Sequence, residues 1–100
     1  MKAMRLFIDV HDKKNQTFPP EISREQFEKF FDGYEKACSE EGVVLVRTYV
    51  SYQSGQAFCL TMAPNQEAVR RAHERVGLAF DSITEVEAAD PHDTFFRRAA

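Results

Sequence analysis

The strongest constraint on the fold is a helix whose two ends are both marked in the sequence. Ser23 is suited to be the N-cap, and Gln26 follows three residues later, which completes a capping box. Gly42 is the expected stop, because glycine adopts left-handed dihedral angles without strain. Between these ends the apolar residues recur every three or four positions and are Phe27, Phe30, Phe31, Tyr34 and Cys38. The pattern predicts an amphipathic helix that buries this stripe.

Four strands and a second helix are predicted around this element. Asn65 is the expected N-cap of the second helix, which ends at Gly77. Segments with β-branched, aromatic or alternating residues, as in strands, are 4–11, 43–52, 56–62 and 80–87. The order β-α-β-β-α-β predicts an α+β fold of the ferredoxin-like kind, an antiparallel sheet with two helices on one face. Because Ile83 and Val86 differ in parity, we expect a bulge or register change in the last strand.

Two helices cover only one face of such a sheet, so its other face calls for a partner. Strand parity assigns to this open face Phe7, Asp9, His11, Leu45, Arg47, Tyr49, Ala57 and Cys59. Several of these residues are apolar, and an exposed apolar patch is typical of an interface. We therefore expect a homodimer. The domain is expected to span 1–87, with the tail 88–100, which contains Phe95 and Phe96, docked at the dimer interface.

Charge and cysteine content narrow the classes of function. The 100 residues carry a formal net charge of −3, which disfavours nucleic acid because phosphate binding needs a concentrated basic surface. No apolar run approaches the roughly 20 residues that cross a bilayer, and no signal peptide is recognised. The cysteines, Cys38 and Cys59, form no C-x-x-C motif and are expected to be reduced, partly buried thiols. These features favour a cytoplasmic protein without a membrane or nucleic-acid partner.

Several segments together resemble a known family. They are DVH at 9–11, AFCLTMAP at 57–64, EAVR at 67–70, HERVGL at 73–78 and ITEV at 83–86. The chain is similar over about residues 4–87 to a family of small bacterial ferredoxin-like proteins, formerly of unknown function and often described as nickel-binding proteins. The resemblance implies a ferredoxin-like homodimer with a surface divalent-metal site in at least some members. It implies no established enzymatic activity.

Four residues within the matching segments are candidate metal ligands. They are His11, Asp9, His73 and Glu74. Nickel favours imidazole nitrogen together with carboxylate or water oxygen. Asp9 and His11 are two residues apart on a strand and therefore project from the same face. His73 lies late in the second helix, where its alternative role is structural, as a partner of the helix dipole or of a nearby carbonyl. The cofactor that these residues suggest is nickel or another divalent metal ion.

Two other classes of function remain open. One is a small cofactor-free enzyme, a monooxygenase or isomerase of the dimeric α+β-barrel kind, with a pocket of His11, Arg47, Tyr49 and Cys59. In that pocket His11 would be the general base. The other is a non-catalytic module that binds a small ligand or a protein, for which no residue stands out. An enzyme is the less favoured of these classes.

Overall fold

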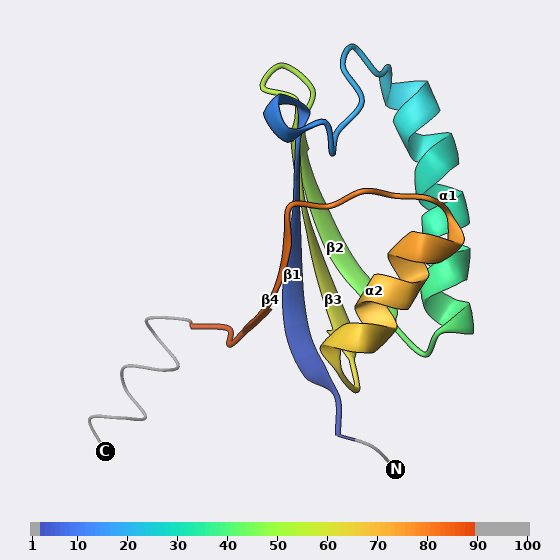
Figure 1. Ribbon diagram of the computed structural model, residues 1–100, viewed down its shortest axis with the longest axis vertical. Coiled ribbons are helices and arrows are strands. Elements are labelled where there is room, and N and C mark those ends of the chain that lie inside the picture. The colour runs from blue at the N-terminus through green and yellow to red at the C-terminus, as the bar shows by residue number, and fades with distance from the viewer. Residues whose placement is uncertain (1–2, 90–100) are drawn as a thin grey trace.

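The computed structural model describes residues 3–89 and has the predicted order of elements (Figure 1). The strands are β1 (Arg5–Asp12), β2 (Val44–Ser51), β3 (Gln56–Ala63) and β4 (Ser82–Val86). The helices are α1 (Arg24–Glu40), α2 (Gln66–Arg75) and the short 3-10 helix η1 (Lys13–Asn15). The predicted ferredoxin-like fold is confirmed. Most of the predicted tail lies outside the described residues, and so do Phe95 and Phe96.

The helix ends form as the sequence predicts. The Ser23 side chain accepts a hydrogen bond from the Gln26 backbone N–H, and the Gln26 side chain accepts one from the Ser23 N–H. The Asn65 side chain caps α2 in the same way through the N–H of Ala68. Gly42 and Gly77 follow the two helices with φ angles of 73° and 65°, a region that glycine tolerates best. No described helix is long and apolar enough to span a membrane.

The sheet has the strand order β2-β3-β1-β4, and each neighbouring pair is antiparallel. Strand β1 is therefore central, with β3 on one side and β4 on the other. Both helices lie on the same side of the sheet, and the opposite side is left open (Figure 1). Any side chain of β1 that points toward the helices is consequently enclosed by strands laterally and by helices above.

The bulge lies in β2 and not in β4. Strand β4 pairs with β1 in a continuous register from Leu6 opposite Val86 to Val10 opposite Ser82, so the prediction for the last strand is wrong. The register shift is between Leu45 and Arg47, which adds one residue to β2 relative to β3. It reverses the alternation of sides along β2, so Leu45 points toward the helices while Arg47 points away.

The face assigned to the core by parity was also wrong. Phe7, Asp9 and His11 lie on the helix-covered side and are 2%, 0% and 3% exposed. Three residues of β2 and β3 that were predicted on the open face also lie on the helix-covered side; they are Leu45, Ala57 and Cys59. Only Arg47 and Tyr49 of the predicted open-face set remain there. The reason is that β1 has apolar residues on both sides, and the side with the polar pair is the one that the helices cover.

The open face is more apolar than the sequence predicted. Strand register brings together on this side Leu6, Ile8, Val10, Val44, Tyr49, Phe58, Leu60, Met62 and Val86. Val44 and Tyr49 are more than half exposed, at 53% and 56%. Scattered apolar residues on a surface need no explanation, but a contiguous sheet face of them is typical of an interaction surface.

Candidate metal centre

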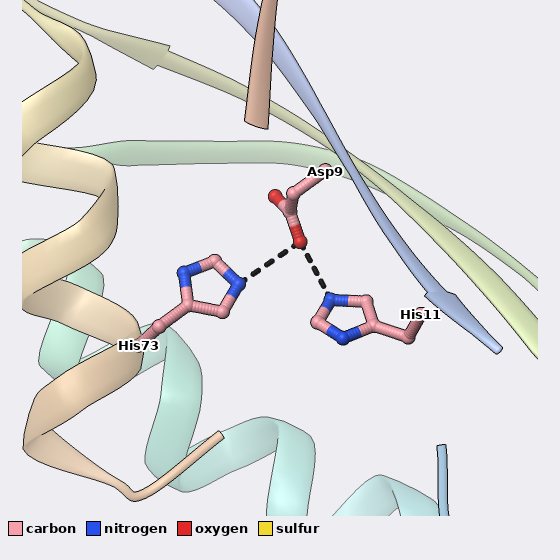
Figure 2. Close-up of side chains that lie close together, drawn as sticks. All are labelled: Asp9, His11 and His73. Carbon is pink, nitrogen blue, oxygen red and sulfur yellow. Dashed lines mark hydrogen bonds and ion pairs between the residues drawn. The ribbon is translucent and has the colours of Figure 1, made fainter. Parts of the chain in front are cut away.

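Three buried polar side chains meet between the sheet and α2 (Figure 2). Asp9 and His11 come from the central strand β1, two residues apart, and therefore point to the same side. His73 comes from α2, four residues after Val69, and its side chain points down toward the sheet. Asp9 and His73 are fully buried. The resemblance implied a surface site, whereas this cluster lies inside the domain.

A single carboxylate oxygen joins the two imidazoles. Asp9 Oδ2 lies 2.6 Å from His11 Nε2 and 2.9 Å from His73 Nε2. Figure 2 shows the carboxylate between the two rings, each of which directs one nitrogen at it. The rings stack with centroids 5.5 Å apart. Three protein groups of the kinds that bind divalent metals thus converge on one point.

The other nitrogen of each ring is held by a backbone carbonyl. His11 Nδ1 is 2.7 Å from Ala79 O, and His73 Nδ1 is 2.8 Å from Val69 O. A carbonyl oxygen only accepts hydrogen bonds, so Nδ1 of each ring must carry the hydrogen. Nε2 of each ring donates a hydrogen bond to Asp9 while it carries a proton, and offers its lone pair to a cation once the proton is lost. Metal-binding histidines are commonly oriented by this kind of hydrogen bond from the opposite nitrogen.

The carboxylate of Asp9 is ionised and incompletely satisfied. Burial by itself would raise the pKa of Asp9, but the hydrogen bonds and positive charge of His11 and His73 outweigh it and lower the pKa below its ordinary value. Within residues 3–89 no group hydrogen-bonds to Asp9 Oδ1, which is buried. A buried carboxylate oxygen without a partner is rare and is a feature that a bound cation or water would remove.

Aromatic and thiol groups complete the surroundings. Tyr34 of α1 lies with its hydroxyl 3.4 Å from both ring nitrogens of His73, and Phe80 meets the same ring edge-on at 5.0 Å between centroids. Cys59 is paired with Asp9 across β1 and β3. Burial, followed by the Asp9 charge, raises the pKa of the Cys59 thiol, and burial raises that of Cys38 to about 11. Both cysteines are therefore free, buried and protonated, as expected for structural thiols.

The donor set suits a divalent transition metal. The ligating atoms of Asp9, His11 and His73 all lie within 4.8 Å of one another. Two imidazole nitrogens and one carboxylate oxygen are ligands that nickel, zinc and iron accept, whereas calcium and magnesium prefer oxygen alone. Three protein ligands leave positions for water or another ligand. The residues present therefore fit a metal ion without any thiolate.

The sequence candidates separate clearly in space. Asp9, His11 and His73 are brought together, while Glu74, one residue further along α2, is exposed and lies outside the cluster. The predicted enzyme pocket is divided by the sheet. Arg47 and Tyr49 contact each other on the open face, at 3.3 Å between Arg47 Nη1 and the Tyr49 hydroxyl, whereas His11 and Cys59 face the helices. Tyr34 was predicted only as part of the helix stripe, and its position there gave no sign of its contact with His73.

Residues 7–86 match the family described as "Nickel responsive protein SCO4226-like". The crystal structure of SCO4226 from Streptomyces coelicolor A3(2) superposes with a TM-score of 0.72 at 29% identity, covering 85% of this chain and 99% of that one. No curated protein matches the chain.

Two more distant structures share the fold alone, both at 12% identity. One is a putative transposase from Deinococcus radiodurans R1, with a TM-score of 0.55 over 99% of this chain and 88% of that one. The other is the protein YJCS, with a TM-score of 0.58 over 87% and 100%. The match over residues 7–86 covers most of the chain, which therefore belongs to the family of SCO4226-like nickel responsive proteins.

Proposed function

We propose that this protein binds one nickel-type divalent ion per chain through Asp9, His11 and His73, and that it sequesters or handles the metal in the cytoplasm. The description of its family as nickel responsive supports nickel as the ion. The observation that carries the proposal is the convergence of two Nε2 atoms on one Asp9 oxygen while both Nδ1 atoms are fixed by carbonyls.

Charge balance supports exchange of protons for a metal at this point. With both Nε2 atoms protonated, two imidazolium ions and one carboxylate give the cluster a net charge of +1. A divalent ion bound to two neutral imidazoles and the same carboxylate gives the same net charge. The buried site therefore accepts the ion without a change in its total charge, and binding releases the protons into solvent. The unpartnered Oδ1 of Asp9 supplies a further oxygen to the ion.

Calorimetric titration with Ni²⁺ tests the site directly. We expect one ion per chain in the wild type, and at least about a hundredfold weaker binding in His73→Gln, because even residues that only orient a ligand change affinity ten- to a hundredfold. Glu74→Gln is the matched control, since it alters the neighbouring, exposed residue of α2. Circular dichroism establishes that each variant is folded. Absence of binding in the wild type, or equal loss in both variants, would contradict the proposal.

The cofactor-free enzyme has less support. A general base needs a free lone pair that reaches substrate, and both nitrogens of His11 are engaged by Asp9 and Ala79. Arg47 and Tyr49, the groups suggested to orient a substrate, lie on the opposite side of the sheet. The structure thus separates the groups that this mechanism would combine.

We also propose that the open sheet face forms a homodimer. Its support is the contiguous apolar surface of β1, β2 and β3, which in a monomer would be left in water. Light scattering after size exclusion is expected to give twice the 11.5 kDa of one chain. Leu60→Glu places a charge in the middle of this face and should give monomers, whereas Gln53→Glu in the exposed β2–β3 turn should leave the dimer intact. A wild type that stays monomeric at all concentrations would refute the interface.

A further inference from the structure

A cavity of about 410 Å³ lies beside the histidine cluster. Its walls come from α1, the loop between β1 and α1, and the segment that joins α2 to β4. Pockets of several hundred Å³ with mainly apolar walls and a few polar groups are typical of sites for small organic ligands. His11 is the one member of the cluster that lines it.

The cavity has mainly apolar walls and a group of polar residues that come from one short segment. Aromatic side chains form much of these walls, among them Phe18, Phe27 and Phe31. The segment that follows directly after β1 contributes polar residues to the lining, namely Lys13, Gln16 and Thr17. His11 contributes ring surface here, because both of its nitrogens are already bonded. A ligand with an apolar body and one polar head matches this division.

The aliphatic stem of Lys13 lies against Gly55. The Lys13 N–H donates to Gly55 O at 2.9 Å, and the aliphatic stem of Lys13 occupies the space where a Cβ on Gly55 would lie. Gly55 also has a φ of 68°, so no other residue fits this position well. The stem of Lys13 therefore lies against the β2–β3 turn, and the residue also lines the cavity.

Among the described residues, Lys13 is the one lysine of the lining, which contains no acidic residue. Within residues 3–89, no ion pair includes Lys13. The two nearby carboxylates, Asp12 and Asp81, are outside the lining and hydrogen-bond to neutral groups: Asp12 accepts from the Lys14 N–H and Gln56, and Asp81 accepts from Thr17 and Asn15. Hydrogen bonds from Gln56 and the Lys14 N–H lower the pKa of Asp12, and the charge of Lys13 contributes to this shift without a direct ion pair. Within the lining, an anionic head would thus be the complement to Lys13.

We propose that this cavity binds a small organic anion, an aryl or acyl carboxylate, with its carboxylate at Lys13 and its apolar body among the phenylalanines of α1 and the loop. The ligand is a second, distinct partner of the protein. The proposal does not depend on a bound metal, because Lys13 and the phenylalanines hold the ligand and His11, a proposed metal ligand, contributes only ring surface to the wall. The two are therefore tested separately.

Fluorescence titration of the full chain in the presence of EDTA provides the test. The probe is 1-naphthylacetate, and 1-naphthylacetamide is its uncharged counterpart. The chain has no Trp, so naphthyl emission is measured with little protein background. We expect saturable binding of the carboxylate and roughly three- to fivefold weaker binding of the amide, the effect of one solvent-accessible ion pair. Equal binding of both compounds, or none of either, would overturn the proposal.

Three variants locate the binding. Lys13→Met should weaken binding of the carboxylate about three- to fivefold and leave that of the amide unchanged. Lys14→Met is the matched control, because Lys14 is adjacent but does not line the cavity. Ala79→Leu fills the cavity from an exposed position and should abolish binding of both compounds while the domain stays folded. Unaltered binding in Ala79→Leu would place the probe elsewhere, such as the open sheet face, and would refute the site.

Discussion

Replacement of Asp9 by asparagine is expected to cost about 3–5 kcal/mol of folding free energy in the metal-free protein, the usual effect of removing one member of a buried ion pair. Asp9 is fully buried and is the shared partner of His11 and His73. Asparagine retains the shape but not the charge, so two buried imidazoles lose their counter-ion. Urea unfolding followed by circular dichroism, in EDTA, measures the difference. Asp32→Asn, on the exposed surface of α1, is the control and should change stability by less than about 0.5 kcal/mol.

The loss of stability caused by Asp9→Asn is expected to depend on pH. The pKa of Asp9 is lowered in the folded protein, so its ionised form is stabilised by folding. This contribution is complete above the ordinary carboxyl pKa of roughly 4 and is lost as the pH falls through the lower native pKa. The gap in stability between wild type and Asp9→Asn should therefore narrow in acid. A gap that is constant down to the acid transition would contradict the role given to Asp9.

Nickel affinity is expected to fall by up to about a hundredfold for each unit by which the pH is lowered. The reason is that each ion must displace two protons, one from Nε2 of each ring. Titration in two buffers of different ionisation enthalpy counts the released protons and should approach two per ion at acidic pH. Glu74→Gln should follow the same curve. Binding without proton release would mean that the ion does not occupy the position between the two rings.

The fold could be predicted because its signals are local. The capping box at Ser23, the glycine after each helix and the alternating strands each depend on a few neighbouring residues. The sides of the sheet could not be predicted in the same way. Strand β1 offers Leu6, Ile8 and Val10 on one side and Phe7, Asp9 and His11 on the other, and only tertiary packing decides which side the helices cover. Hydrophobicity favoured the first set, whereas the buried face holds the polar cluster.

The candidate site was partly within reach of the sequence. Spacing alone placed Asp9 and His11 on one side of a strand, and this is confirmed. The choice between His73 and Glu74 depended on the rotation of α2 relative to β1, which periodicity fixes only approximately. Arg47 and Tyr49 lie on the opposite side of the sheet from Cys59 because of the bulge in β2. No turn residue or glycine in the sequence indicated a bulge at that point. Tyr34 contacts His73 because α1 packs against α2, and the sequence distance between these helices hides this contact.

Strand β1 carries the proposed metal ligands on one side and the middle of the proposed dimer surface on the other, in alternating residues. Asp9 lies between Ile8 and Val10 along the same backbone, so a displacement of the strand at the metal ligands also displaces the residues of the dimer surface. Thermodynamic linkage then fixes a symmetrical relation between the two events. Because the proposed dimer holds two ions, the factor by which saturating nickel changes the dimer association constant equals the product of the factors by which dimerisation changes the two nickel association constants.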